Sequence, residues 1–120
     1  MGVICCTEQL GYSIVAPRAH VLDVTGDYNL FRRVTDIVHD VAEALKVTLP
    51  TERVYLMSLG SHQGNAHLHW RVVPLPPGVP YEQQQFHAVM AENGILEVTR
   101  EKQTALAASI RSAIKDQQRT

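Results

Sequence analysis

The chain has 120 residues, a formal net charge of −1 at pH 7, a hydrophobic content of 45% and a charged content of 19%. These values are typical of a compact globule with its own hydrophobic core, so we expect residues 1–120 to form a single domain. They exclude a general nucleic-acid binder, which needs a strong positive field, and a membrane-spanning protein, because no apolar run approaches roughly 20 residues.

Residues 1–10 form a short segment before the first recognisable element. Its adjacent Cys5 and Cys6 match neither a redox motif nor a metal-binding pair, and free thiols in a reducing compartment are the simpler interpretation. Met1-Gly2 does not begin a secretory signal pattern. We therefore expect a cytoplasmic protein.

A strand, a connector and a long helix are predicted next. Residues Tyr12 to Pro17 (YSIVAP) form an apolar run that Pro17 ends, and the connector from Arg18 to Gly26 carries His20. Asp27 can cap a helix that continues to about Leu49. The predicted buried face of this helix has apolar residues at steps of three and four: Leu30, Phe31, Val34, Ile37, Val38, Val41 and Leu45.

Two further strands are predicted over Glu52 to Leu59 and Ala66 to Pro74, joined by the short loop from Gly60 to Asn65. A short connection favours an antiparallel hairpin. A proline-rich loop follows over residues 75–81, then a short helical candidate from Tyr81 to Glu92.

The last predicted element is a helix over residues 99–117. The whole pattern indicates an α+β fold, with a small three-stranded antiparallel sheet, one long helix packed on the sheet and a C-terminal helix.

Three basic residues alternate along the third predicted strand. Because successive side chains point to opposite faces, His67, His69 and Arg71 share one face, and Leu68, Trp70 and Val72 share the other, which can be buried. Histidines on a strand are more often solvated than functional. Three chargeable groups side by side nevertheless suppress one another's protonation, so a purely structural strand gains little from them. Two imidazoles and a guanidinium favour a phosphate site, with one imidazole as a possible nucleophile.

The segment His67-Leu68-His69-Trp70-Arg71-Val72-Val73 resembles the signature of the histidine triad (HIT) superfamily, in which histidines alternate with apolar residues. Upstream, residues Gly11 to His20 (GYSIVAPRAH) are similar to the family's glycine, apolar strand, proline and histidine. The similarity runs from about Gly11 through the C-terminal helix. The chain resembles a bacterial HIT-like protein with a His-x-His-x-Arg variant motif and a short N-terminal segment, which implies one HIT-like domain over residues 1–120.

The resemblance implies a role for each matching residue. His69 takes the position of the histidine that attacks the α-phosphate of a nucleotide and forms a nucleotidyl-histidine, which water or another acceptor then releases. His67 matches the histidine that orients the nucleophile, and His20 matches the upstream histidine that approaches the phosphate or leaving group. The expected phosphate contacts of the loop come from Gln63, Gly64 and Asn65.

The third motif position holds Arg71 instead of histidine. Its guanidinium can bind phosphate in a bidentate manner but does not exchange protons at neutral pH. We therefore expect a site for a purine nucleotide or nucleotide conjugate, without a cofactor, in a protein that resembles nucleotidyl hydrolases and transferases and, on the same ground, forms a homodimer.

Two alternatives remain open from the sequence. A degenerate protein that binds nucleotide without chemistry is one, because Arg71 is longer than histidine and can fill the phosphate site. The other is a zinc site on His67 and His69, with His20 or His62 as third ligand. The positive charge of Arg71 opposes that site, and we predict no metal.

Overall fold

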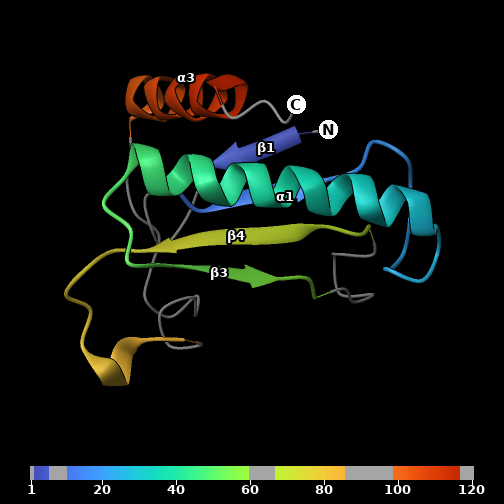
Figure 1. Cartoon of the computed structure of the whole chain (residues 1–120), viewed down its shortest axis with the longest axis horizontal. Coiled ribbons are helices and arrows are strands. Elements are labelled where there is room, and N and C mark those ends of the chain that lie inside the picture. The colour runs from blue at the N-terminus through green and yellow to red at the C-terminus, as the bar shows by residue number, and fades with distance from the viewer. Residues whose placement is uncertain (1, 6–10, 60–66, 86–98, 117–120) are drawn as a thin grey trace.

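A computed structural model of the chain describes residues 2–5, 11–59, 67–85 and 99–116. Four antiparallel strands form one sheet in the order β1-β2-β4-β3. Their bounds are β1 Gly2–Cys5, β2 Ser13–Ala16, β3 Arg53–Met57 and β4 Trp70–Leu75. Helix α1 (Tyr28–Thr48) lies across one face of the sheet, and α3 (Arg100–Asp116) packs on α1 (Figure 1). The α+β class expected from the sequence is confirmed.

Strand β1 corrects the sequence interpretation of the first ten residues, which placed no strand there. Gly2–Cys5 pairs antiparallel with β2, with Val3 opposite Val15 and Ile4 opposite Ile14. The sheet therefore has four strands among the described residues, and not the three that we expected. The run Gly2–Cys5 (GVIC) shows no alternation of apolar and polar residues, so its sequence does not identify it as a half-buried strand.

Helix α1 begins and ends close to the predicted residues. The Asp27 side chain caps it by accepting a hydrogen bond of 3.1 Å from the backbone N–H of Leu30. At the other end, Leu49 is the C-cap and precedes Pro50. Between them, residues at helical spacing are buried on the sheet side: Val34, Val38, Val41, Ala44 and Leu45.

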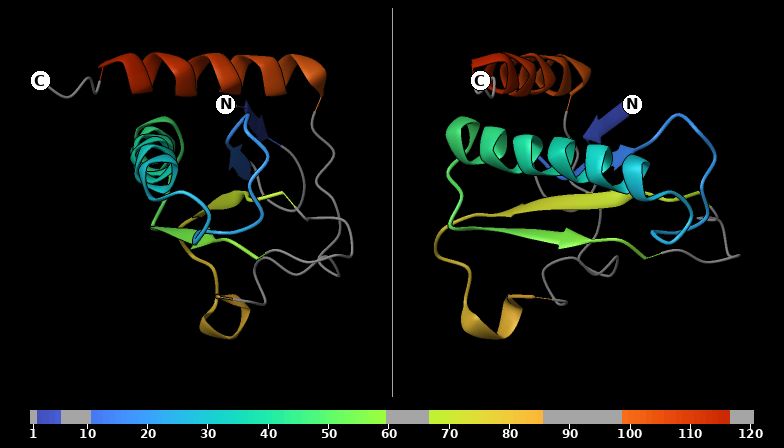
Figure 2. Two further views of the ribbon diagram at one scale, coloured as in Figure 1. Left: turned by 90° about the vertical axis from the view of Figure 1, so that its right-hand side faces the viewer. Right: turned by 45° about the vertical axis from the view of Figure 1, so that its right-hand side comes forward.

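The hydrophobic core lies between α1 and the sheet. Val15 of β2 and Val72 of β4 are fully buried in it, and Leu106 and Ile110 of α3 belong to the same cluster. Figure 2 shows the same layering, with α1 between α3 and the β3–β4 hairpin. Burial of this apolar surface is the main contribution to stability.

The predicted hairpin is present, but β4 is displaced along the chain. It begins at Trp70, whereas the sequence predicted Ala66, and it includes Pro74 and Leu75. Met57 lies opposite Arg71 and Leu56 opposite Val72. Residues 67–69 therefore precede the regular ladder and are held by other contacts, which the next subsection describes.

The segment after β4 differs from the predicted helix over Tyr81 to Glu92. Tyr81–Gln83 is a single 3-10 turn, and residues 86–98 lie outside the described part of the chain. The backbone N–H of Gln85 donates to the Tyr55 hydroxyl at 2.9 Å, which ties this segment to β3. Within the described ranges, no helix is both long and apolar enough to cross a bilayer.

Gly11 allows β2 to pass close under the end of α1. It has a φ of +86°, and a Cβ at this position would lie 2.6 Å from Leu49 Cδ1 and 3.0 Å from Pro74 Cγ. Gly78 has nearly the same φ, +85°, but no atom lies within 4 Å of a Cβ there. A side chain at either glycine would strain the backbone, but only a side chain at Gly11 would also overlap neighbouring atoms.

We predict that Gly11→Ala destabilises the fold by about 2–4 kcal/mol, because both the left-handed backbone and overpacking contribute. Gly78→Ala, the matched control, should cost only about 1 kcal/mol, for the backbone alone. Urea unfolding monitored by the fluorescence of the single tryptophan measures both values. Equal shifts in the two variants would show that the close approach at Gly11 contributes nothing.

Candidate functional site

The three residues before β4 are held by contacts with segments that are distant in sequence. The His67 ring nitrogen Nε2 lies 2.7 Å from the Pro17 carbonyl oxygen, and the backbone N–H of Leu68 donates to the Val21 carbonyl at 2.6 Å. On the other side, the Ser58 hydroxyl donates to the His69 carbonyl at 2.7 Å. The connector after β2 and the end of β3 therefore fix this stretch in place of a regular strand ladder.

His69 is held in one tautomer by its own chain. Its Nδ1 lies 3.0 Å from the carbonyl oxygen of His67. Since a carbonyl oxygen only accepts, Nδ1 carries the hydrogen and Nε2 of the neutral ring carries the lone pair. The side chain is buried, with 7% of the residue exposed, and Nε2 has no hydrogen-bond partner among the described residues. A buried imidazole with an unengaged lone pair is suited to act as a nucleophile.

His67 and His20 form a second unit beside His69. By the same argument, the bond to the Pro17 carbonyl places a hydrogen on Nε2 of His67 and leaves its buried Nδ1 without a partner in the described structure. The His20 ring stacks on His67, with centroids 5.3 Å apart and planes at 21°. The structure thus brings His20 together with His67, and His67 together with His69.

The connector that carries His20 is ordered by a local turn. The Thr25 hydroxyl and backbone N–H both donate to the Asp23 carboxylate, and the backbone N–H of Gly26 donates to the Asp23 carbonyl at 3.3 Å. These hydrogen bonds, that of the Thr25 hydroxyl above all, lower the pKa of the Asp23 carboxyl below its ordinary value. The turn lies directly after Val21, whose carbonyl holds Leu68.

Arg71 contacts a different partner from the histidines. It lies in β4 opposite Ile14 of β2 and Met57 of β3. One guanidinium nitrogen, Nη1, donates to the Tyr12 hydroxyl at 3.0 Å, and Nε is buried with no partner among the described residues. Its described polar contact is therefore with a tyrosine that the sequence analysis did not select.

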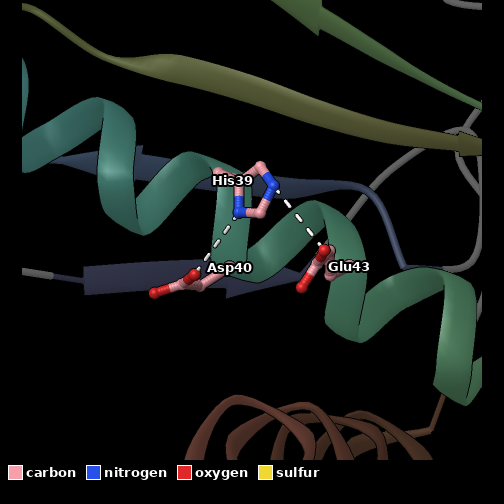
Figure 3. Close-up of polar contacts among 3 residues, drawn as sticks. All are labelled: His39, Asp40 and Glu43. Atoms are coloured by element: carbon pink, nitrogen blue, oxygen red, sulfur yellow. Dashed lines mark ion pairs between the residues drawn. The ribbon is translucent and has the colours of Figure 1, made fainter. Parts of the chain in front are cut away.

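Several predicted site residues are not placed. Gln63, Gly64 and Asn65, together with His62, lie outside the described residues. Among the residues that are described, no group of three His, Cys, Asp or Glu side chains could hold a metal ion. His39, the remaining described histidine, is on α1 and lies 3.5 Å from Asp40 and 3.6 Å from Glu43 (Figure 3).

Sequence reasoning missed four residues that hold the site: Tyr12, Pro17, Val21 and Ser58. The carbonyl of Pro17 bonds to a ring nitrogen of His67, and the hydroxyl of Ser58 bonds to the backbone carbonyl of His69. Sequence motifs do not predict contacts of this kind. Tyr12 begins the predicted strand. Which face of the sheet its side chain lies on, and so its proximity to Arg71, follows only once the register of β2 on β4 is known.

Comparison with known proteins identifies the fold. No known family profile and no curated protein sequence matches the chain. Solved structures do match. A Hit-like protein involved in cell-cycle regulation from Bartonella henselae has 20% identity and a TM-score of 0.65, over 86% of this chain and 70% of its own. A hypothetical histidine triad nucleotide-binding protein from Sulfolobus tokodaii has 22% identity and a TM-score of 0.67, over 88% and 70%. The HIT-like fold is thereby confirmed.

The hydrogen-bond pattern predicts the tautomer of each histidine. At neutral pH, long-range ¹H–¹⁵N correlation spectra should show neutral His69 with its hydrogen on Nδ1, and neutral His67 with its hydrogen on Nε2. His39, an exposed side chain on α1, serves as the reference for a ring outside the site. An Nε2–H form of His69 would contradict the geometry described here.

Proposed function

We propose that the chain is a HIT superfamily protein that binds a nucleotide and transfers its nucleotidyl group through His69. The observation that carries this proposal is the tautomer of His69: Nδ1 is committed to the His67 carbonyl, and the unpartnered Nε2 keeps its lone pair. The HIT-like fold and the nucleotide-binding name of the Sulfolobus tokodaii protein support the choice of substrate class.

The first step forms a covalent intermediate. The Nε2 lone pair attacks the α-phosphorus, an N–P bond forms, and the bond to the leaving group breaks with its electron pair on that group. The imidazole becomes positively charged, since Nδ1 retains its hydrogen. The His67 carbonyl that accepts from Nδ1 stabilises this charge, as an oriented acceptor beside a histidine base does in general.

The second step releases the nucleotide. A water oxygen attacks the same phosphorus, the N–P bond breaks with its electrons returning to Nε2, and a water proton leaves to the solvent. The stacked rings of His67 and His20 lie next to His69, and the stacking keeps the His67 ring in its orientation. The fixed positive charge of Arg71 favours a bound anion.

A binding protein without turnover is the second candidate. Arg71 favours it, because a permanent cation binds phosphate in the ground state as well as in the transition state, and such uniform binding does not accelerate the chemical step. The two functions differ in one observable, the appearance of a nucleotidyl-histidine.

We predict that His69→Ala abolishes nucleotidyl transfer and the covalent nucleotide adduct while the protein remains folded. The test incubates the wild type with adenosine phosphoramidate and with dinucleoside polyphosphates, then measures released monophosphate and protein-bound nucleotide by mass spectrometry. His39→Ala, which changes an exposed histidine of α1, is the control and should retain turnover. A His69→Ala protein with wild-type turnover would refute the assignment. Nucleotide binding without any adduct in the wild type would favour the non-catalytic candidate.

We also propose a homodimer formed along β3. Among the described strands, β3 is at the edge of the sheet, and it carries exposed apolar side chains, with Leu56 at 49% and Leu59, just beyond it, at 67% exposure. An unpaired edge with apolar side chains favours pairing with a second copy.

Sedimentation velocity tests the dimer. The wild type should sediment as a dimer. Leu56→Glu should raise the dissociation constant of the dimer at least tenfold, because the substitution buries a charge in the interface. Val47→Glu, at a position of α1 that is 75% exposed, is the control and should leave the dimer intact. A monomeric wild type would remove the proposal.

A further inference from the structure

Arg71 and Tyr12 are joined by a hydrogen bond, and each keeps a donor for which the described residues provide no acceptor. Tyr12 is buried, with 2% exposed, and its hydroxyl oxygen accepts from Arg71 Nη1 at 3.0 Å. The hydroxyl hydrogen remains free to donate, because the phenol is donor and acceptor at once. The Nε–H of Arg71 is also buried and has no partner in the described structure.

Within residues 2–5, 11–59, 67–85 and 99–116, no carboxylate forms an ion pair with Arg71. Among the described residues, the ion pairs that the structure shows lie on α1 and involve His39, and none involves Arg71. A guanidinium offers only donors, and a half-buried cation with unsatisfied donors is costly. An anion that accepts from both Arg71 and Tyr12 would satisfy these donors and balance the charge.

The pair lies on the side of the sheet away from α1 and close to His69. Trp70 packs toward α1, where its ring is 6.2 Å from that of Phe31. Arg71 follows Trp70 in β4 and therefore points to the opposite face. His69 and Arg71 are two residues apart, which separates their Cα atoms by at most about 7 Å in an extended chain. A group bound at His69 is within reach of a long arginine side chain.

We propose that Arg71 and Tyr12 bind the leaving group, and that the substrate is a nucleotide whose leaving group departs as an oxyanion. This inference rests on the proposed nucleotidyl transfer at His69. The substrate class is then nucleoside diphosphates and related phosphoric anhydrides, and not phosphoramidates, in which an amine leaves. Tyr12 is thereby a specificity-determining residue beyond those of the HIT signature.

The chemistry of departure explains the preference. When the N–P bond to His69 forms and a P–O bond to phosphate breaks, the electron pair goes to the departing oxygen, which leaves as an anion and needs no proton. An amine must take up a proton as its P–N bond breaks; a guanidinium does not supply one at neutral pH, and a phenol is a far weaker acid than an imidazolium. Donors aimed at the developing negative charge stabilise the first reaction selectively.

The experiment compares two substrates with the same adenosine monophosphate group. Turnover of ADP, which loses phosphate, and of adenosine phosphoramidate, which loses ammonia, is measured by release of AMP. We expect kcat/KM for ADP to exceed that for the phosphoramidate at least tenfold. Tyr12→Phe and Arg71→His should each reduce the ADP value at least tenfold and change the phosphoramidate value by less than threefold. The matched controls Tyr28→Phe and Arg53→Gln alter exposed residues of the same types and should change neither.

Pyrophosphate binding gives a readout that is independent of turnover. Calorimetry should show that Arg71→Gln lowers the affinity for pyrophosphate at least tenfold relative to Arg53→Gln, with circular dichroism confirming that both variants are folded. A preference for the phosphoramidate, an equal loss on both substrates, or unchanged pyrophosphate affinity would overturn the inference. Absence of any adduct on His69, with pyrophosphate affinity still dependent on Arg71, would instead refute nucleotidyl transfer and leave an anion-binding pair.

Discussion

The hydrogen bond from Nδ1 of His69 to the carbonyl of His67 is the interaction on which the proposed chemistry depends. It assigns the hydrogen to one ring nitrogen and leaves the other free, without a carboxylate or another side chain. The bond requires that the backbone at residue 67 be held still. The contacts from Pro17, Val21 and Ser58 provide this restraint, because they fix the stretch from both sides just before β4 begins.

Strand alternation in β4 separates two tasks within a few residues. Trp70 and Val72 pack with α1 and belong to the hydrophobic core, so they anchor the strand that follows the histidines. Arg71, between them, faces the other side of the sheet and meets Tyr12. The packing of Trp70 and Val72 in the core therefore positions Arg71, whose side chain lies on the face of the sheet that α1 does not cover. A polar substitution at Val72 would affect both the stability of the fold and the placement of Arg71.

Arg71 stands where the signature that the chain resembles has a histidine, and this difference changes the chemistry that the site can support. An imidazole can both donate a hydrogen bond and transfer a proton near neutral pH, whereas a guanidinium only donates and carries a constant charge. In this chain Arg71 is hydrogen-bonded to a buried tyrosine, Tyr12, which lies 59 residues away in the sequence. The proposed preference for an oxyanion leaving group follows from that pair.

The sequence by itself determined the α+β class, the extent of α1 with its Asp27 cap, the antiparallel hairpin and the central position of His69. These follow from local signals: apolar spacing, a capping side chain, turn residues and a short motif. Only the tertiary structure decided that Gly2–Cys5 adds a strand, that β4 begins at Trp70, and that Arg71 meets Tyr12. Each of these depends on the register between segments distant in sequence, and register is set by packing and cross-strand hydrogen bonds that no local pattern encodes.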